Sequence, residues 1–198
     1  MKKLFLLLCL LSMLTSVGFA QESRQDASIS FIGTYQPTIT GNSAIQTSTL
    51  GKGALLGYRF MLTPSYAIQG NYQYSQFDMK YDGNYGPARI HTVLQEYSAS
   101  FVRYFVYKKF NPFVMAGGGI LSFRPIDDTG TTNNGVSNGK SISFLFGGGI
   151  AYELSPSWDI RVQYRSYLLK SIDFGLGQYS TNRYYLMQQP AIGLAYHF

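Results

Sequence analysis

The feature that most constrains this chain is the alternation of apolar and polar residues in segments whose polar face includes charges. The segment 158–165 reads Trp-Asp-Ile-Arg-Val-Gln-Tyr-Arg. Because successive side chains of a β-strand point to opposite faces, one face of this strand is apolar and the other is charged or polar. The segment 66–74 repeats the pattern, with Tyr and Ile set against Gln and Asn. Strands of this kind are typical of a sheet that has lipid on one side and a polar interior on the other.

The composition agrees with a β-structure of low surface charge. The 198 residues include 21 Gly, 17 Tyr and 14 Phe, and only 13% are charged, which is roughly half the usual share. This composition excludes a disordered chain. Beyond residue 20 no run of 18 apolar residues occurs, so the sequence predicts no membrane-spanning helix in the mature chain. A barrel strand produces no such run, and a membrane barrel stays open.

The first 20 residues have the pattern of a cleaved secretory signal peptide. Two lysines precede the apolar run 4–14, and a pair of small residues ends at Ala20, before a polar stretch. We expect residues 1–20 to be removed and residues 21–198 to form a single barrel domain. The only cysteine, Cys9, would leave with the signal, so the mature chain would contain no disulfide.

The charge distribution argues against a nucleic-acid partner. Loss of two lysines with the signal lowers the Lys and Arg count from 16 to 14, against 10 Asp and Glu, which leaves a net charge of about +4. Apart from the pair Lys108 and Lys109, the basic residues are scattered singly. A nucleic-acid interface needs a clustered basic patch, so we expect none here.

The spacing of the alternating segments predicts an all-β fold, an eight-stranded antiparallel up-and-down transmembrane β-barrel. Tight turns alternate with long connections, and in such barrels the short turns face the periplasm, so both termini are expected there. Hydrocarbon offers no hydrogen-bond partner, so the sheet must close, and eight strands leave an interior that side chains fill. The expected strands are 27–35, 52–62, 66–74, 90–105, 111–123, 141–154, 158–165 and 190–198; the expected long connections are 36–51, 78–89, 124–140 and 168–183.

Five charged residues have the parity of the polar face and are expected to point into the barrel. They are Arg59, Glu96, Glu153, Arg161 and Arg165. Because an isolated buried ion costs several kcal/mol, charges in a narrow lumen must be paired or hydrated. We therefore predict a structural ion network, with an ion-conducting or gating role as the alternative. The glycine triplets 117–119 and 147–149 lack the Lys-Ser/Thr and the helix of a phosphate-binding loop and are interpreted as strand glycines.

The carboxyl-terminal residues carry a family resemblance. Ile192, Leu194, Tyr196 and Phe198 alternate and end on an aromatic residue, which resembles the terminal assembly signal of bacterial outer-membrane barrels. With the signal peptide, the eight strands and the glycine-rich motifs, residues 24–198 resemble the OmpA/OmpX/opacity-type small barrels.

This resemblance implies a location and a set of partners. The protein would be an integral outer-membrane barrel, in contact with outer-membrane lipid, with a structural or surface-interaction role of the adhesin or envelope-integrity kind. Periplasmic chaperones and the barrel-insertion machinery would handle it during assembly, the latter reading Tyr196 and Phe198. The long loops would contact any surface ligand, and the barrel would be a monomer.

Other function classes find weaker support in the sequence. A lipid-modifying barrel enzyme needs a nucleophilic serine with a histidine and an acid, and His91 would reach Ser98 or Ser100 only with unusual local geometry. We therefore expect no catalytic, cofactor or metal site. A secreted soluble β-barrel carrier of lipocalin type needs many charged outward positions, more than this chain can supply. The soluble carrier, the lipid-modifying enzyme and a small pore remain as alternatives.

Overall fold

The computed structural model describes residues 24–42, 44–84, 86–131 and 135–198, and most of them lie in β-strands. The expected signal peptide, residues 1–20, lies outside this described part. The strands are β1 (Gln25–Thr34), β2 (Ile39–Gly41), β3 (Ala44–Ser48), β4 (Gly51–Thr63), β5 (Tyr66–Gly83), β6 (Ala88–Tyr104), β7 (Phe110–Ile126), β8 (Gly139–Ser155), β9 (Trp158–Lys170) and β10 (Tyr184–His197). One 3-10 turn, η1 (Gly177–Tyr179), precedes β10. Within the described residues no helix is long and apolar enough to cross a membrane.

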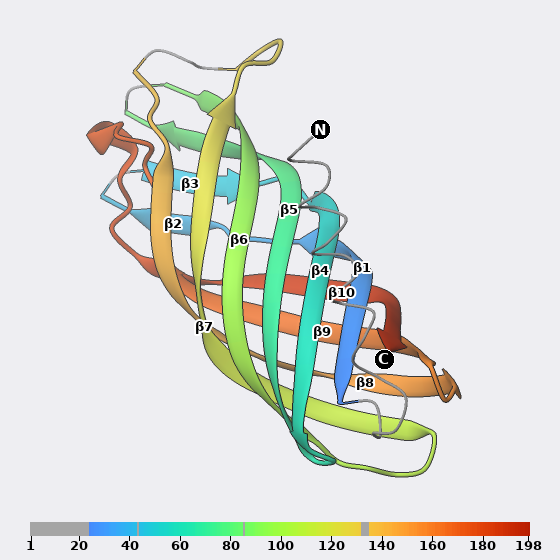
Figure 1. Cartoon of the computed structure of the whole chain (residues 1–198). Helices are drawn as coiled ribbons and strands as arrows, with labels where there is room; N and C mark the ends of the chain where they lie inside the picture. Colours follow the sequence, from blue (N-terminus) through green and yellow to red (C-terminus); the bar gives the residue numbers. More distant parts are fainter. Residues whose placement is uncertain (1–23, 43, 85, 132–134) are drawn as a thin grey trace, which may run out of the picture.

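Eight of the strands form a closed antiparallel barrel. Each of β4 to β9 pairs with the next strand along the chain, and β1 closes the ring by pairing with both β4 and β10. Figure 1 shows these strands tilted around a common axis. The predicted fold class, an eight-stranded antiparallel up-and-down barrel, is confirmed. We call the end that holds Gln25 and His197 the terminus end and the opposite end the distal end.

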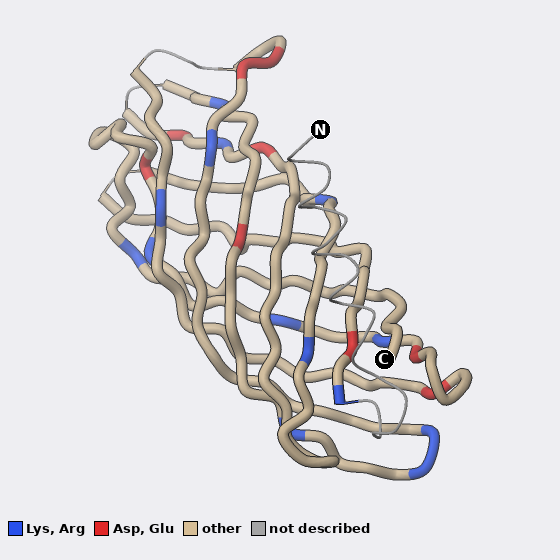
Figure 2. Tube along the Cα trace, in the orientation of Figure 1, with Lys and Arg blue, Asp and Glu red and all other residues tan. Residues whose placement is uncertain are grey.

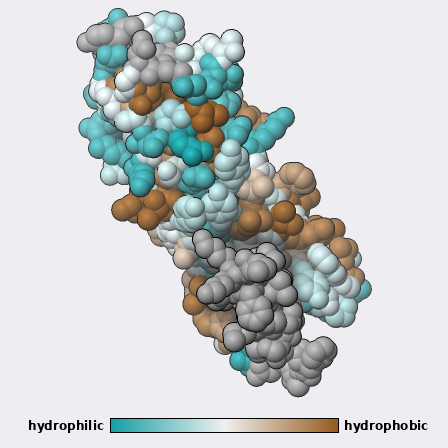
Figure 3. Space-filling view, turned by 45° about the horizontal axis from the view of Figure 1, so that its top comes forward, coloured by the Kyte–Doolittle hydropathy of each residue, from teal (hydrophilic) through white to brown (hydrophobic). Residues whose placement is uncertain are grey.

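The two faces of the wall have the polarity that the alternation predicts. Along β9, Trp158, Val162 and Tyr164 are exposed on the outside, while Arg161 and Arg165 are buried inside. The same division holds along β1, β4 and the terminus half of β5. Figure 3 shows hydrophilic residues gathered at the distal end and hydrophobic residues along the wall. A lipocalin-type carrier would expose its polar face instead, so that alternative is wrong.

One predicted long connection, 78–89, is wrong. Strand β5 continues to Gly83 and β6 begins at Ala88, so only a short turn joins them. The prediction failed because the two faces exchange character: Phe77, Met79 and Tyr81 are buried inside, while the alternating positions on the outside are polar. The alternation therefore continues with its polarity inverted, as expected where the strands leave the lipid and the outer face meets water.

Two further differences concern the connection 36–51 and the start of β10. The expected connection 36–51 contains the hairpin of β2 and β3, and β3 pairs with β5 residues 79–83. The last strand begins at Tyr184 instead of residue 190, because Pro190 lies inside the strand and does not mark its start. The ladder between β1 and β10 ends at Ala191, next to this proline. Beyond Ala191, among the described residues, β1 and β10 are joined on this edge by the isolated bridge of Tyr35 and Gln188. The missing N–H donor of Pro190 therefore costs little.

Candidate functional site

Inward-facing glycines make room in the barrel for large side chains. A Cβ atom on Gly149 of β8 would lie 2.8 Å from the Phe113 ring and 2.3 Å from the Val162 carbonyl oxygen. A Cβ atom on Gly57 of β4 would lie 2.6 Å from Ser28 Oγ. These positions fit the interpretation of the triplets as strand glycines, because a side chain there would displace the residues that fill the interior.

A continuous polar network crosses the middle of the interior from Arg59 on β4 to Arg165 on β9. Arg59 Nε donates to Gln69 Oε1 at 2.7 Å, and Gln69 donates in turn to Asn71. Asn71 Nδ2 donates to Ser98 Oγ at 3.2 Å, and Ser98 Oγ donates to Glu96 Oε1 at 2.7 Å.

The network ends at a buried ion pair. Glu96 accepts hydrogen bonds from Arg165 Nη2 and from the Tyr167 hydroxyl, and these three side chains are almost completely buried. The guanidinium carbon of Arg165 also lies 5.3 Å from the centroid of the Tyr167 ring. Because Glu96 and Arg165 neutralise each other, this polar cluster is buried without a net charge.

A second ion-pair cluster lies nearer the terminus end. Arg161 donates to both carboxylate oxygens of Asp26 at 3.1 Å, a bidentate geometry. Its Nη2 lies 4.0 Å from Asp159 Oδ2, and Asp159 in turn lies 2.8 Å from His197 Nε2. These contacts join the first strand of the chain to the last two, β9 and β10, across the seam where the barrel closes.

Apolar layers lie at both ends of the polar network. Towards the terminus end, Tyr104 and Phe113 pack with Val102 and Met115 in a small buried cluster. The Arg59 guanidinium carbon lies 5.1 Å from the Tyr104 ring centroid and 4.8 Å from that of Phe113, which places cation–π contacts at the boundary. Towards the distal end a larger cluster fills the barrel; it includes Phe77, Met79, Tyr81, Ile90, Leu94, Phe123, Leu145, Tyr185 and Met187.

The structure brings four of the five predicted lumen residues into these clusters. Arg59, Glu96, Arg161 and Arg165 are buried and bonded as described above. Glu153 has the expected inward parity on β8, but it is only half-buried and forms no ion pair with another described residue. It stands opposite Asp159, a second acid, near the terminus end.

Several members of the clusters were missed from the sequence. Asp26 gave no signal because it is a lone acid just before the expected strand 27–35, and its partner lies 135 residues away. Gln69, Asn71 and Ser98 have the inward parity that the alternation indicates, but they are uncharged and were not selected. Tyr167 lies two residues after Arg165 on β9 and has the same inward parity, and this parity could have identified Tyr167 as an interior residue.

An outward-facing polar cluster lies on the distal part of the β5–β6 hairpin. Asp78 Oδ1 lies 2.6 Å from His91 Nδ1, and Asp78 Oδ2 accepts from Arg89 Nη2 at 2.8 Å. Burial raises the pKa of Asp78, but the hydrogen bonds from His91 and Arg89 outweigh it and hold the pKa below its ordinary value.

The catalytic alternative required His91 to meet Ser98 or Ser100. Both serines face the interior, on the other face of β6, so the structure does not bring them to His91. Among the described residues no group of three His, Cys, Asp or Glu side chains is arranged to hold a metal ion.

The predicted assembly residues lie on the outer wall at the terminus half of β10. Ile192, Leu194 and Tyr196 are exposed on one face of the strand, and Phe198 follows it. The Tyr196 ring lies 5.0 Å from Trp158 and 6.2 Å from Phe198, and Phe198 lies 6.4 Å from Tyr58, all between centroids. The aromatic end of β10 is therefore packed against rings from β4 and β9.

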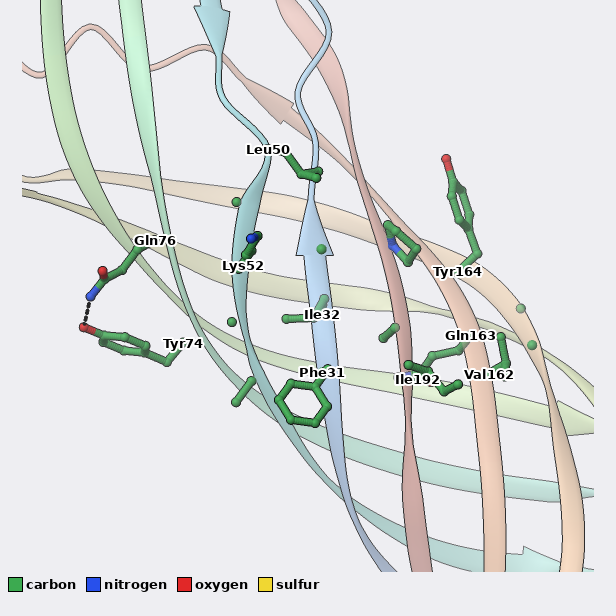
Figure 4. A pocket seen from close by; sticks show the side chains of 18 of the residues that line it. Phe31, Ile32, Leu50, Lys52, Tyr74, Gln76, Val162, Gln163, Tyr164 and Ile192 are labelled. Atoms are coloured by element: carbon green, nitrogen blue, oxygen red, sulfur yellow. Dashed lines mark hydrogen bonds between the residues drawn. The ribbon is translucent and has the colours of Figure 1, made fainter.

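A shallow apolar groove of about 1070 Å³ crosses the outer wall over β4, β1, β10, β9 and β8. Figure 4 shows Phe31, Ile192 and Val162 in this groove, with Lys52 and Gln76 at one side. Small residues, Gly33, Ala54, Gly148 and Pro190, line it between the larger side chains. Its exposed apolar surface is of the kind that lipid chains cover in a membrane.

Comparisons with known proteins identify relatives of this architecture. A family model described as an outer membrane protein beta-barrel domain matches residues 6–198. No curated protein matches the sequence.

Solved structures of bacterial surface barrels share the fold. Neisserial surface protein A is 14% identical, with a TM-score of 0.60 over 89% of this chain and 98% of that chain. OprG from Pseudomonas aeruginosa is 11% identical, with a TM-score of 0.65 over 90% and 98%. Ail of Yersinia pestis, solved with the heparin analogue sucrose octasulfate, is 15% identical, with a TM-score of 0.52 over 88% and 99%.

Proposed function

This chain belongs to the outer membrane protein β-barrel domain family, and from that premise we propose that it is a monomeric, non-catalytic barrel with a structural or surface-contact role in the outer membrane. The observation that carries the proposal is the filled interior. Buried side chains occupy the barrel from the aromatic cluster at the terminus end, through the ion pairs, to the distal apolar cluster. An interior filled in this way supports a scaffold more than a solute channel.

The proposed role of the lumen charges is structural. Arg59, Glu96, Arg161 and Arg165 link β1, β4, β5, β6 and β9 across the interior, and a network of hydrogen bonds and ion pairs within the protein holds strands together without needing a substrate. Glu153, without an ion pair among the described residues, would contribute least to this function.

The proposed role of Ile192, Leu194, Tyr196 and Phe198 is recognition by the barrel-insertion machinery. Their exposure on the outer wall supports it, because a signal read before or during insertion must lie on an accessible face. Residues 1–20 would direct export and be removed, and periplasmic chaperones would hold residues 21–198 in transit. The termini would then face the periplasm, and the distal loops would meet any ligand outside the cell.

A gel assay on purified outer membranes tests this proposal. A closed barrel resists unfolding in detergent until it is heated, so unboiled and boiled samples should migrate differently. Deletion of Phe198 should reduce the amount of the heat-modifiable form in the membrane, since insertion would be impaired. Planar bilayers containing the same protein should show no steady conductance.

Two results would count against the proposal. Protein recovered in the soluble fraction without a heat-dependent shift would contradict the membrane location. Steady channel openings that disappear when Arg165 and Glu96 are substituted would instead assign the interior to conduction.

A further inference from the structure

We infer that the outer wall of β7 to β10 carries a binding surface for the phosphate headgroup of an anionic lipid, at the distal edge of its apolar belt. The surface consists of four basic residues, Arg124, Lys140, Lys170 and Arg183, which we call the basic rim. The inference rests on the proposed membrane location and names the kind of lipid that the barrel would select there. Figure 2 shows Lys and Arg on several strands towards the distal end.

The register of the strands makes the basic rim continuous. Lys140 of β8 stands opposite Ser122 of β7, two residues from Arg124. Lys170 of β9 stands opposite Tyr184 of β10, which follows Arg183. Side chains in such diagonal positions on neighbouring strands lie within reach of one group.

The same register joins the two pairs. The most distal partners of β8 and β9 are Phe144 and Leu168. If this register is continued by two residues, Lys170 lies opposite Ile142, and Lys140 is the next outward-facing residue on β8. All four side chains are exposed; Arg124, Lys140 and Lys170 have outward parity on β7, β8 and β9, and Arg183 directly precedes β10. The positive charges therefore form a row across these three strands to the start of β10.

The positive charge of the basic rim is not neutralised by the protein. None of its four side chains forms an ion pair or a side-chain hydrogen bond with another described residue. The only acids on the four strands are Glu153 and Asp159, and both have inward parity at the terminus end. The adjoining loops carry Asp127, Asp128 and Asp173, but none of these acids forms an ion pair with a side chain of the basic rim, and Asp128 and Asp173 instead accept hydrogen bonds from loop backbone N–H groups. An anion from outside the protein is therefore the partner that four exposed cations would attract.

The position of the basic rim favours a lipid over a free anion. On the membrane side of the cations come exposed apolar residues: Ile142 is 85% exposed and Tyr184 is 71% exposed, and Leu168 and Ile120 lie at matching positions. Further along β8, β9 and β10 the apolar groove of Figure 4 begins, at Gly148, Tyr164 and Pro190. A headgroup phosphate at the basic rim would thus have its acyl chains over an apolar surface, and each nearby Lys or Arg adds to the attraction.

A tryptophan reporter tests the inference. Tyr184→Trp in a Trp158→Phe background places the single indole beside Arg183 and opposite Lys170. The barrel, purified from outer membranes, is reconstituted in phosphatidylcholine with a minor fraction of phosphatidic acid carrying bromine on its chains. The quenching should correspond to about a fivefold excess of phosphatidic acid around this indole over its bulk fraction. This factor is what the attraction of a single nearby Lys or Arg, about 1 kcal/mol, would produce.

Matched charge variants identify the residues responsible. The combined substitutions Arg124→Gln, Lys140→Gln, Lys170→Gln and Arg183→Gln should return the lipid near the indole to its bulk fraction. The equal charge change at the terminus end, Arg24→Gln, Arg103→Gln, Lys108→Gln and Lys109→Gln, should leave the excess unchanged. If the fourfold rim variant does not insert, the double variants Arg124→Gln with Lys140→Gln and Lys170→Gln with Arg183→Gln should each lower the excess.

Three results would overturn the inference. The first is an equal excess in rim and control variants, which would indicate attraction by net charge alone. The second is an equal excess around native Trp158, at the terminus end. The third is displacement by inorganic phosphate at the lipid's own concentration, which would remove the preference for a lipid. Failure of brominated phosphatidylcholine to quench the reporter in the unsubstituted rim would instead contradict the proposed membrane location.

Discussion

At the scale of single residues, the buried charges of the interior depend on one another. Arg165 is enclosed by Glu96 and Tyr167, and Arg161 is bound by both oxygens of Asp26. Removing one partner of such a pair leaves an uncompensated buried charge, which costs much more than the pair contributes when intact. The residues of these pairs should therefore be more sensitive to substitution than exposed charges of the same type.

The first prediction concerns Glu96. Glu96→Gln leaves the Arg165 guanidinium buried without a counter-ion, and we expect the free energy of unfolding to fall by about 3–5 kcal/mol. Reversible denaturant unfolding of the barrel in lipid bilayers measures this. Glu153→Gln is the matched control, because Glu153 is half-buried without an ion pair among the described residues, and should change stability by less than about 0.5 kcal/mol. Equal effects of the two substitutions would show that the Glu96 pair has no special importance.

The second prediction concerns the pH response of the Asp78 cluster. The pKa of Asp78 is lowered in the folded protein, because bonds from His91 and Arg89 outweigh the effect of burial. A lowered folded pKa gives stability that is fully present above the unfolded value, about 3.9, and is lost as the pH falls through the folded value. Hydrogen-exchange protection of residues 79–90, corrected for intrinsic rates, should therefore fall on acidification below about pH 4.

Asp78→Asn separates this effect from general acid damage. The variant should show the lower protection at neutral pH, with little further change on acidification, because the titrating group is gone. Unchanged acid sensitivity in the variant would assign the effect to other carboxyl groups.

At the scale of elements, β5 shows what a sequence can and cannot predict. Its terminus half was predicted correctly, since apolar residues from Tyr66 to Tyr74 face outward and polar ones face inward. Its distal half was mistaken for a loop, because from Phe77 onward the inner face is apolar and the outer face polar. A periodicity of two is the same in both halves, so the exchange of faces marks a change of solvent and not the end of a strand.

The third prediction compares two glycines in strands. A Cβ atom at Gly149 would approach backbone and ring atoms closer than 3 Å, whereas nothing lies within 4 Å of one at Gly70 on the outer face. Gly149→Ala should therefore destabilise the barrel by about 1–3 kcal/mol through overpacking. Gly70→Ala should be neutral or slightly stabilising, because it reduces the entropy of the unfolded chain. Denaturant unfolding in bilayers measures both, and equal effects would contradict the role given to inward glycines.

At the scale of the whole molecule, closure of the barrel decides which charges meet. Parity in the sequence was enough to place Arg59, Glu96, Arg161 and Arg165 inside, because each strand reports its own inner face. It could not pair Arg161 with Asp26, since β1, which carries Asp26, comes beside β10 and near β9 only when the ring closes. The hairpin of β2 and β3 was missed for a similar reason, as β3 finds its partner in the distal part of β5.

The last prediction concerns the orientation of the barrel. The connections at the terminus end are short, whereas three of the four between barrel strands at the distal end span a dozen or more residues, an asymmetry that in such barrels places the short turns in the periplasm. Asp127→Cys places a cysteine in the distal loop after β7, and Lys109→Cys places one in the terminus-end turn before β7. The only native cysteine, Cys9, is in the expected signal peptide. On intact cells a membrane-impermeant maleimide should label Asp127→Cys alone, and after permeabilisation of the outer membrane it should label both variants. Labelling of Lys109→Cys alone on intact cells would reverse the orientation, placing the termini outside the cell and the basic rim at the inner leaflet.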